Sequence, residues 1–214
     1  LGRFSISNDQ VKGGTSMKAI YQQGAADAPV LVLLHGTGGD EQSLLEVGKA
    51  LDPQASLLGI RGNVLENGMP RYFKRLVEGV YDEADLALRG DELADFIRQA
   101  AKEYNFSLAQ VVLVGYSNGA NIAIRLLLND SDHFKKAILY HAMYPVENLP
   151  TNSLPDTHVF LSFGRNDPIV SLADSAYVQE IFTSRGAALS TVWTPSHQLT
   201  YEEVEHSRTW LTEQ

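Results

Sequence analysis

Apolar and polar positions alternate along the chain in blocks that predict strands and helices in turn. The run at residues 30–34 is apolar at every position, which is typical of a parallel strand covered on both faces. Other short apolar runs predict strands at residues 56–60, 111–115, 137–140, 159–163 and 189–193. Apolar residues at helical spacing predict helices at residues 40–51, 83–104 and 118–128, from residue 171 to Gly186, and from residue 200 onward. This order predicts one doubly wound α/β domain, with its chemistry at the carboxyl ends of the strands.

Capping residues mark several of the expected helix ends. Asp40 is expected to cap the first helix, and Ser171 to cap the fourth. Thr200 and Glu203 have the spacing of a capping box for the last helix. The long second helix has a weak point at Gly90. Residues 61–75 are interpreted as a long loop, because they contain Gly62, Gly68 and Pro70.

Composition excludes several classes of function. The 214 residues carry a formal charge of −9, so the chain has no evident basic surface for a nucleic-acid backbone. The absence of cysteine excludes disulfides, thiolate metal sites and cysteine nucleophiles. No apolar run approaches the length of a membrane span, and no signal segment opens the sequence. We therefore expect a cytoplasmic protein without a membrane span.

Residues 17–214 are expected to form the single domain, and residues 1–16 are set apart from it. The sequence begins at Leu1, and Met17 follows a segment rich in glycine, serine, asparagine and aspartate. We interpret residues 1–16 as a vector-derived or poorly structured leader. The alternative is a native β-hairpin with Phe4 and Ile6 on one strand.

The clearest chemical motif is a G-x-S-x-G sequence at residues 115–119. It follows the apolar run 111–115 and opens a segment of helical spacing with several small residues. A turn of this kind strains the backbone of Ser117, exposes its hydroxyl and places it at a helix N-terminus that stabilises negative charge. We interpret Ser117 as a nucleophile. The alternative is an ordinary turn in which Ser117 only caps the helix.

A nucleophilic serine needs a base, and the base needs an orienting carboxylate. In hydrolases with such a turn, the chain order is serine, acid, histidine. His197 lies just past the last strand, and Asp167 directly follows the strand at 159–163, so we interpret them as base and acid. For Asp167 the alternative is a plain turn residue before Pro168. His141 follows the strand next to the nucleophile's, and is either part of the pocket wall or a partly buried histidine.

Negative charge that develops on a substrate carbonyl oxygen needs two N–H donors, each worth about 3–4 kcal/mol when removed. The backbone of Asn118, directly after the nucleophile, is expected to supply one donor. Thr37, in the glycine-rich loop after the strand at 30–34, is expected to supply the other. The alternative for this loop, a dinucleotide-binding fingerprint, requires glycine where the chain has Glu41. With no Walker A sequence and no H-E-x-x-H motif, we expect neither a cofactor nor a metal.

These motifs together resemble the phospholipase/carboxylesterase family of α/β hydrolases. The similarity rests on LVLLHGTGGD at 31–40, GYSNG at 115–119 and the two downstream loops, and it covers the chain from residue 17 onward. The resemblance implies an α/β-hydrolase fold, with a mostly parallel sheet, helices on both faces and a minimal lid or none. It also implies the roles already given to Ser117, Asp167, His197, Thr37 and Asn118.

Within that family, the chain is most similar to bacterial serine hydrolases induced by hydroquinones or copper. These share a segment like ENGMPRYF at 66–73 and the sequence HQLT at 197–200. Acyl-protein thioesterases, which it also resembles, usually carry Gly-His-Gly at the base and Gln after the nucleophile. This chain has Ser196-His197-Gln198 and Asn118 instead. The difference argues against long-acyl protein substrates and leaves hydrolysis unaffected.

The predicted function is that of a serine esterase that cleaves small carboxylic esters through an acyl-enzyme intermediate. The loop at 61–75 should overhang the site, with Tyr72 and Phe73 as a wall and Arg71 facing a substrate carboxylate. The alternative for Arg71 is a pair with Glu66 that only fixes the loop. Lysophospholipase or acyl-thioesterase activity is the enzymatic alternative, and a non-catalytic binding protein on a hydrolase fold is the other. We expect a small-molecule ester as partner, no nucleic acid, and a monomer or homodimer.

Overall fold

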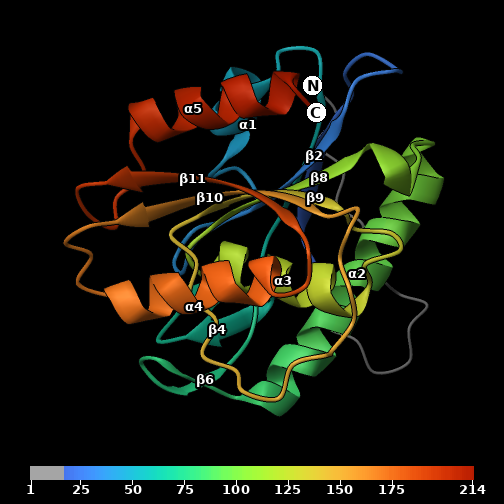
Figure 1. Ribbon diagram of the computed structural model, residues 1–214. Coiled ribbons are helices and arrows are strands. Elements are labelled where there is room, and N and C mark those ends of the chain that lie inside the picture. The colour runs from blue at the N-terminus through green and yellow to red at the C-terminus, as the bar shows by residue number, and fades with distance from the viewer. Residues whose placement is uncertain (1–16) are drawn as a thin grey trace.

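A seven-stranded sheet forms the centre of the molecule in the computed structural model, which describes residues 17–214 (Figure 1). Strand β1 pairs antiparallel with β3, and the other neighbours in this sheet pair in parallel. The doubly wound α/β fold predicted from the sequence is therefore confirmed. In spatial order the strands are β1 (Ala19–Gln22), β3 (Ser56–Ile60), β2 (Val30–Leu34), β8 (Val111–Tyr116), β9 (Lys136–Tyr140), β10 (His158–Gly164) and β11 (Ala188–Thr194).

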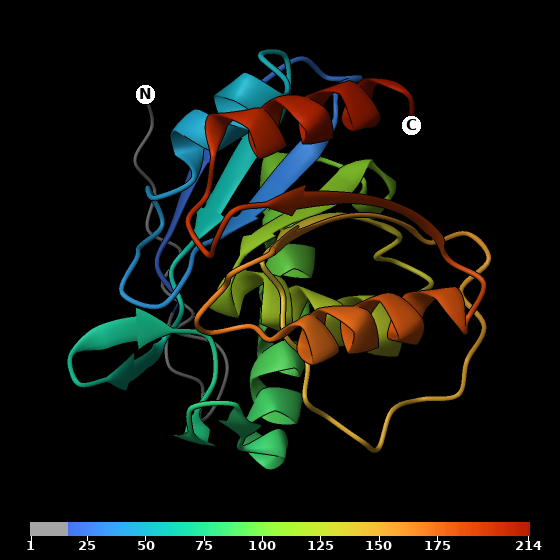
Figure 2. The same ribbon diagram turned by 60° about the vertical axis from the view of Figure 1, so that its left-hand side comes forward.

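Helices cover both faces of this sheet. In Figures 1 and 2, α1 and α5 lie on one face, and α2, α3 and α4 lie on the other. Each face has its own hydrophobic core, and the strands contribute alternate side chains to the two cores. This explains why β2 is apolar and buried at every position. The helices are α1 (Leu45–Leu51), α2 (Glu83–Tyr104), α3 (Asn118–Asn129), α4 (Leu172–Thr183) and α5 (Tyr201–Thr212), with a short 3-10 helix at Leu108–Gln110.

The caps predicted from the sequence are present in α4 and α5, but the one predicted for α1 is not. Ser171 caps α4, and Thr200 forms a capping box with Glu203 at the start of α5. The prediction that Asp40 caps the first helix is wrong, because α1 begins only at Leu45. The Asp40 carboxylate instead accepts the backbone N–H of Gln42 at 2.9 Å, which stabilises a turn before the helix.

The prediction of a plain loop at residues 61–75 is also wrong. Two hairpins occupy this part of the chain and its continuation, and both stand out from the body of the molecule (Figure 2). Asn67 and Gly68 form the first turn, both with positive φ, as a tight hairpin turn requires. The hairpin strands are β4 (Val64–Glu66) with β5 (Met69–Arg71), and β6 (Arg75–Val77) with β7 (Val80–Tyr81).

Gly90 does not interrupt α2, which is continuous over Glu83–Tyr104. A Cβ atom at Gly90 would lie 2.6 Å from Cγ of Arg125, so glycine allows α2 and α3 to pack closely. In the described range 17–214, no helix has both the length and the apolar character to cross a membrane. The expected leader at residues 1–16, with its alternative hairpin, lies outside the described residues.

Candidate active site

Ser117 sits in a sharp turn between β8 and α3. Its backbone has φ 51° and ψ −115°, an unfavourable conformation for a residue with a side chain, which its N–H bond to the Tyr140 carbonyl at 2.9 Å helps to hold. Gly119 is required behind the turn, because a Cβ there would lie 2.0 Å from the carbonyl oxygen of Leu34. Ser117 occupies the N-cap position of α3, yet its side chain makes no capping hydrogen bond. The hydroxyl is therefore available for other chemistry.

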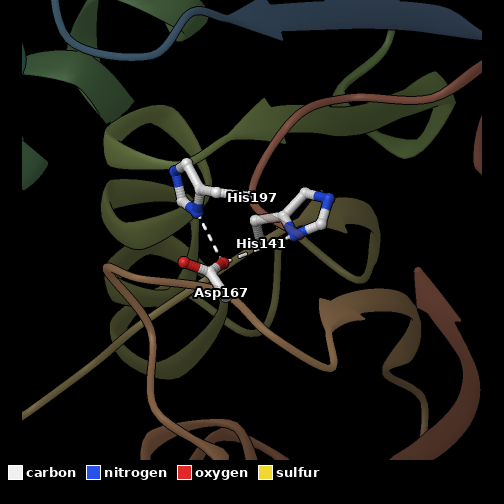
Figure 3. Close-up of side chains that lie close together, drawn as sticks. All are labelled: His141, Asp167 and His197. Carbon is white, nitrogen blue, oxygen red and sulfur yellow. Dashed lines mark hydrogen bonds and ion pairs between the residues drawn. The ribbon is translucent and has the colours of Figure 1, made fainter. Parts of the chain in front are cut away.

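The structure brings Ser117, His197 and Asp167 together in one chain of contacts. Nε2 of His197 lies 3.0 Å from Oγ of Ser117, and Nδ1 of His197 lies 2.6 Å from Oδ2 of Asp167 (Figure 3 shows the His197–Asp167 contact). The Asp167 side chain is fully buried, whereas that of His197 is 13% exposed. An imidazole that donates from Nδ1 to a carboxylate can accept a proton at Nε2 from the serine.

Backbone contacts hold the loops that carry Asp167 and His197. The second carboxylate oxygen of Asp167 accepts the N–H groups of Ile169 at 2.7 Å and Val170 at 2.9 Å. The hydroxyl of Tyr116, the residue before Ser117, donates to the carbonyl of His197 at 3.0 Å. Sequence reasoning missed Tyr116, although its place inside the G-x-S-x-G motif puts it at the site. These contacts fix both loops relative to Ser117.

The backbone N–H groups of Asn118 and Thr37 are the candidates for an oxyanion hole that the sequence suggested. Asn118 is the first residue of α3, where a backbone N–H has no partner within the helix. Its side-chain oxygen accepts the N–H of Tyr72 at 2.7 Å, which ties the turn to the segment after β5. Thr37 lies exposed in the loop after β2, and the next residue, Gly38, donates its N–H to Pro70 at 2.9 Å. The hairpin β4–β5 thus braces the loop of Thr37.

The His35 side chain also holds the loop that carries Thr37. Its Nε2 accepts the N–H of Gly62 at 3.0 Å, and its Nδ1 lies 2.7 Å from the carbonyl oxygen of Gly36. A ring that accepts at Nε2 and donates at Nδ1 is neutral. Burial lowers the pKa of His35 below its ordinary value, and the bond to Gly36 opposes this shift only in part.

Acid should therefore weaken the fold through His35. The pKa of His35 is lower in the folded protein than its ordinary value of 6.5, so the unfolded chain takes up the proton first as the pH falls. Neutral His35 contributes its full stabilisation at pH values above 6.5, its ordinary pKa. This contribution is lost as the pH falls towards the lower pKa that His35 has in the folded protein. We expect the free energy of unfolding, measured in urea from about pH 7.5 to about pH 5, to fall less steeply in His35→Asn than in the wild type.

The control for this prediction is His206→Gln, because His206 is exposed on α5 and should leave the slope unchanged. Equal slopes for the wild type and His35→Asn would contradict the proposed link between His35 and acid stability.

Arg71, Tyr72 and Phe73, the residues expected to bind substrate, are buried and bonded within the protein. Tyr72 and Phe73 are almost fully buried, and the Tyr72 hydroxyl donates to Ile60 and accepts from the N–H of His35. Arg71 is buried as well, with its guanidinium bonded to the carbonyl of Phe73 at 2.8 Å and to Glu66 at 2.9 Å. Glu66 also binds Arg75, and this bond is the main reason that the pKa of Glu66 is lowered. These side chains therefore support the hairpin beside the site.

His141 lies next to Asp167, with a fully buried side chain. Its Nδ1 is 3.7 Å from Oδ2 of Asp167, and its Nε2 is 3.0 Å from Oε2 of Glu203. In Figure 3, His141 and His197 lie on either side of Asp167. Sequence reasoning assigned Glu203 only to the cap of α5, where Oε1 accepts the N–H of Thr200 at 2.6 Å. The contact of Glu203 with His141 joins the start of α5 to the end of β9, which lie far apart in the sequence.

A metal ion would have one candidate set of ligands in the described residues. His141, Asp167 and His197 each offer one ligand atom, and these atoms lie within 4.8 Å of one another. Two of these three ligand atoms, those of Asp167 and His197, already bond to each other at 2.6 Å. The prediction of an enzyme without metal or cofactor stays a prediction.

A serine in a strained turn at the carboxyl edge of a parallel sheet, within reach of a histidine and an aspartate, defines an α/β hydrolase. A model of the phospholipase/carboxylesterase family matches residues 15–213. The chain therefore belongs to the phospholipase/carboxylesterase family, as its motifs indicated, and is a carboxylic ester hydrolase.

Relatives and solved structures agree with this family. The chain is 48% identical over 198 residues to the candidate hydrolase MhqD of Bacillus subtilis, covering 92% of this chain and 98% of MhqD. A Bacillus cereus carboxylesterase is similar in structure, with a TM-score of 0.89, 45% identity, and coverage of 92% of this chain and 94% of the other. The protein YahD, solved with malic acid, has a TM-score of 0.88 and 34% identity, with coverage of 92% and 98%.

Proposed function

We propose that this protein is a serine carboxylesterase that cleaves small carboxylic esters through an acyl-enzyme intermediate. The observation that carries the proposal is the contact of 3.0 Å between Nε2 of His197 and Oγ of Ser117, together with the contact of 2.6 Å between His197 and Asp167. A serine that only capped α3 would need neither contact.

In the first half of the proposed reaction, Oγ of Ser117 attacks the ester carbonyl carbon while Nε2 of His197 takes the hydroxyl proton. The carbonyl oxygen becomes negative and binds the N–H groups of Thr37 and Asn118. Asp167 stabilises the imidazolium of His197. When the tetrahedral intermediate collapses, the C–O bond to the alcohol breaks and His197 gives its proton to the leaving oxygen.

In the second half, a water molecule attacks the acyl carbon, and its proton passes to His197. The oxyanion again binds the N–H groups of Thr37 and Asn118. The bond from the acyl carbon to Oγ of Ser117 then breaks, Oγ recovers its proton from His197, and the carboxylic acid leaves. Every proton in this cycle moves through one imidazole nitrogen, so the proposed reaction needs no cofactor.

The preferred size of the acyl group depends on the hairpin β4–β5, which lies next to the loop that carries Thr37. The sulfur of Met69 lies 3.6 Å from the position of a Cβ on Gly38, so Met69 borders the loop of Thr37. Met69 is partly exposed, and the buried Tyr72 and Phe73 close the protein behind it. A short hairpin of this kind offers little apolar surface to a long chain. In the proposed mechanism, Arg71, Tyr72 and Phe73 shape this border and do not touch the substrate.

We expect kcat/KM for nitrophenyl esters to be highest at about two to six acyl carbons and to fall beyond that. A long groove would instead bury each added methylene, at up to about 0.8 kcal/mol each, and kcat/KM would rise steadily with length. Met69→Ala should move the optimum to longer acyl groups, whereas Leu76→Ala, on the exposed part of the other hairpin, should not move it.

An optimum beyond about ten carbons would favour lysophospholipase or acyl-thioesterase activity. The proposal of serine catalysis is tested separately with a fluorophosphonate, which should label Ser117 and no other residue. An unlabelled protein without turnover on any ester would favour a binding protein on a hydrolase fold.

A further inference from the structure

Residues 70–72 lie between the two loops that supply the proposed oxyanion donors. In the first of these loops, Gly38 donates its N–H to the carbonyl of Pro70 at 2.9 Å. Two residues further along, the N–H of Tyr72 donates to Oδ1 of Asn118, in the turn after β8, at 2.7 Å. One short stretch of chain therefore connects the glycine-rich loop after β2 to the turn of the nucleophile.

This stretch has little freedom to move by itself. Arg71 and Tyr72 are buried, and the guanidinium of Arg71 donates to the carbonyl of Phe73 at 2.8 Å. The Tyr72 hydroxyl accepts the N–H of His35 at 3.0 Å and donates to the carbonyl of Ile60 at 2.6 Å. His35 lies at the base of the glycine-rich loop, so residues 70–72 contact that loop at two points. A shift of this stretch would therefore shift the loop with it.

The Asn118 side chain is the contact on the other side. It is buried, and its orientation is fixed because a backbone N–H must face the oxygen of the amide. Its Nδ2 is also buried and has no hydrogen-bond partner within residues 17–214. A buried donor without a partner is costly, and an apolar side chain would avoid that cost. The contribution of asparagine at this position is therefore the bond from Oδ1 to Tyr72.

We propose that the Asn118 side chain, acting through residues 70–72, sets the spacing between the two N–H donors of the oxyanion hole. Such donors must lie about 2.7–3.1 Å from the developing oxyanion, so an altered spacing weakens the transition state more than the bound substrate. The backbone N–H of Asn118 contacts substrate in the proposed mechanism, whereas its side chain is a positioning group. The inference rests on the proposed function, which supplies the two donors.

The first test measures amide hydrogen exchange at Gly38 by NMR, in the wild type and in Asn118→Ala. This variant keeps the backbone N–H of residue 118 and removes only the bond to Tyr72. We expect the Gly38 amide to exchange at least about tenfold faster in the variant, because Pro70 is no longer held from the far side. Gly38 bonds to Pro70 and not to Asn118, so an unchanged rate would overturn the proposed coupling.

The matched control is Asn121→Ala, in the same first turn of α3. Asn121 is also buried, and its Oδ1 accepts a backbone N–H, that of Met143, at 2.8 Å. The control therefore removes the same kind of bond to a different segment, the one after β9. It should leave exchange at Gly38 and kcat close to the wild type. If both variants changed them equally, a general loosening of α3 would be the cause and the proposal would fail.

The second test is kinetic, with rates expressed per site that fluorophosphonate labels at completion. We expect Asn118→Ala to lower kcat by about 10- to 100-fold with KM within about twofold, because the donors act in the transition state. A short alkylboronic acid, which forms a tetrahedral adduct with Oγ of Ser117, should bind more weakly by the factor that kcat/KM loses. A normal kcat per labelled site, with fewer sites labelled, would show that the side chain only stabilises the fold.

The labelling also separates this inference from the proposed function. If fluorophosphonate does not label Ser117 in the wild type, the proposed function fails and the inference fails with it. If Ser117 is labelled, but Asn118→Ala matches the wild type in Gly38 exchange and in kcat, the inference alone fails.

Discussion

Ser117→Ala should abolish ester turnover, with kcat lower by about 10⁶-fold, and should abolish fluorophosphonate labelling. Without Oγ there is no group to form the acyl-enzyme, and only binding and the oxyanion donors remain. The fold should be almost unaffected, because the Ser117 side chain makes no capping bond to α3. The measurements are initial rates on a short-chain nitrophenyl ester, labelling followed by mass spectrometry, and urea unfolding of both proteins.

Ser171→Ala is the matched control, since Ser171 also stands at a helix N-cap but does accept an N–H, from Asp174 at 3.0 Å. It should keep full activity and lose about 1 kcal/mol of stability. Loss of a nucleophile removes activity and leaves stability unchanged, whereas loss of a cap lowers stability and leaves activity unchanged. The two variants therefore distinguish these roles. Labelling that persists in Ser117→Ala would mean that another residue is the nucleophile.

The main sheet could be predicted from the sequence because its strands are buried on both faces. Strands β2 and β3 have the bounds that their apolar runs predicted. The hairpin strands at the rim have only two or three residues each, with exposed side chains such as Leu65 and Val77, and so leave no periodic pattern. The pair Asn67-Gly68 was a usable signal, since this dipeptide is typical of tight hairpin turns. Its significance was missed because the neighbouring residues resembled a loop.

The components of the proposed triad could be ordered from the sequence because each lies within three residues of the carboxyl end of a strand. Parallel strands place their carboxyl ends at one edge, so Ser117 after β8, Asp167 after β10 and His197 after β11 meet there. The buried contact of His141 with Glu203 could not be found from strand ends. Glu203 contacts His141 across 62 positions of sequence. That contact depends on how the start of α5 faces the end of β9, which no local pattern encodes.

Asp167→Asn should lower kcat by about 10⁴-fold, or about 5.5 kcal/mol of transition-state stabilisation, while the fold stays intact. The oxygen of the new amide will be held by the N–H groups of Ile169 and Val170, which now bind Oδ1 of Asp167. The amide nitrogen then faces Nδ1 of His197 and donates to it. The His197 proton moves to Nε2, where it prevents the ring from accepting the proton of Ser117. Steady-state kinetics on a short-chain ester would measure the loss.

The control is Asp174→Asn, which makes the same chemical change a few residues away. The carboxylate of Asp174 accepts the hydroxyl of Ser171 at 2.6 Å and serves only the capping box of α4. This variant should keep kcat and KM and lose at most about 1 kcal/mol of stability. If Asp167→Asn kept kcat within about tenfold of the wild type, the tautomer of His197 would not depend on Asp167. The acid of the mechanism would then have to be sought elsewhere, because the contact at 2.6 Å is proposed both to orient the base and to stabilise its imidazolium.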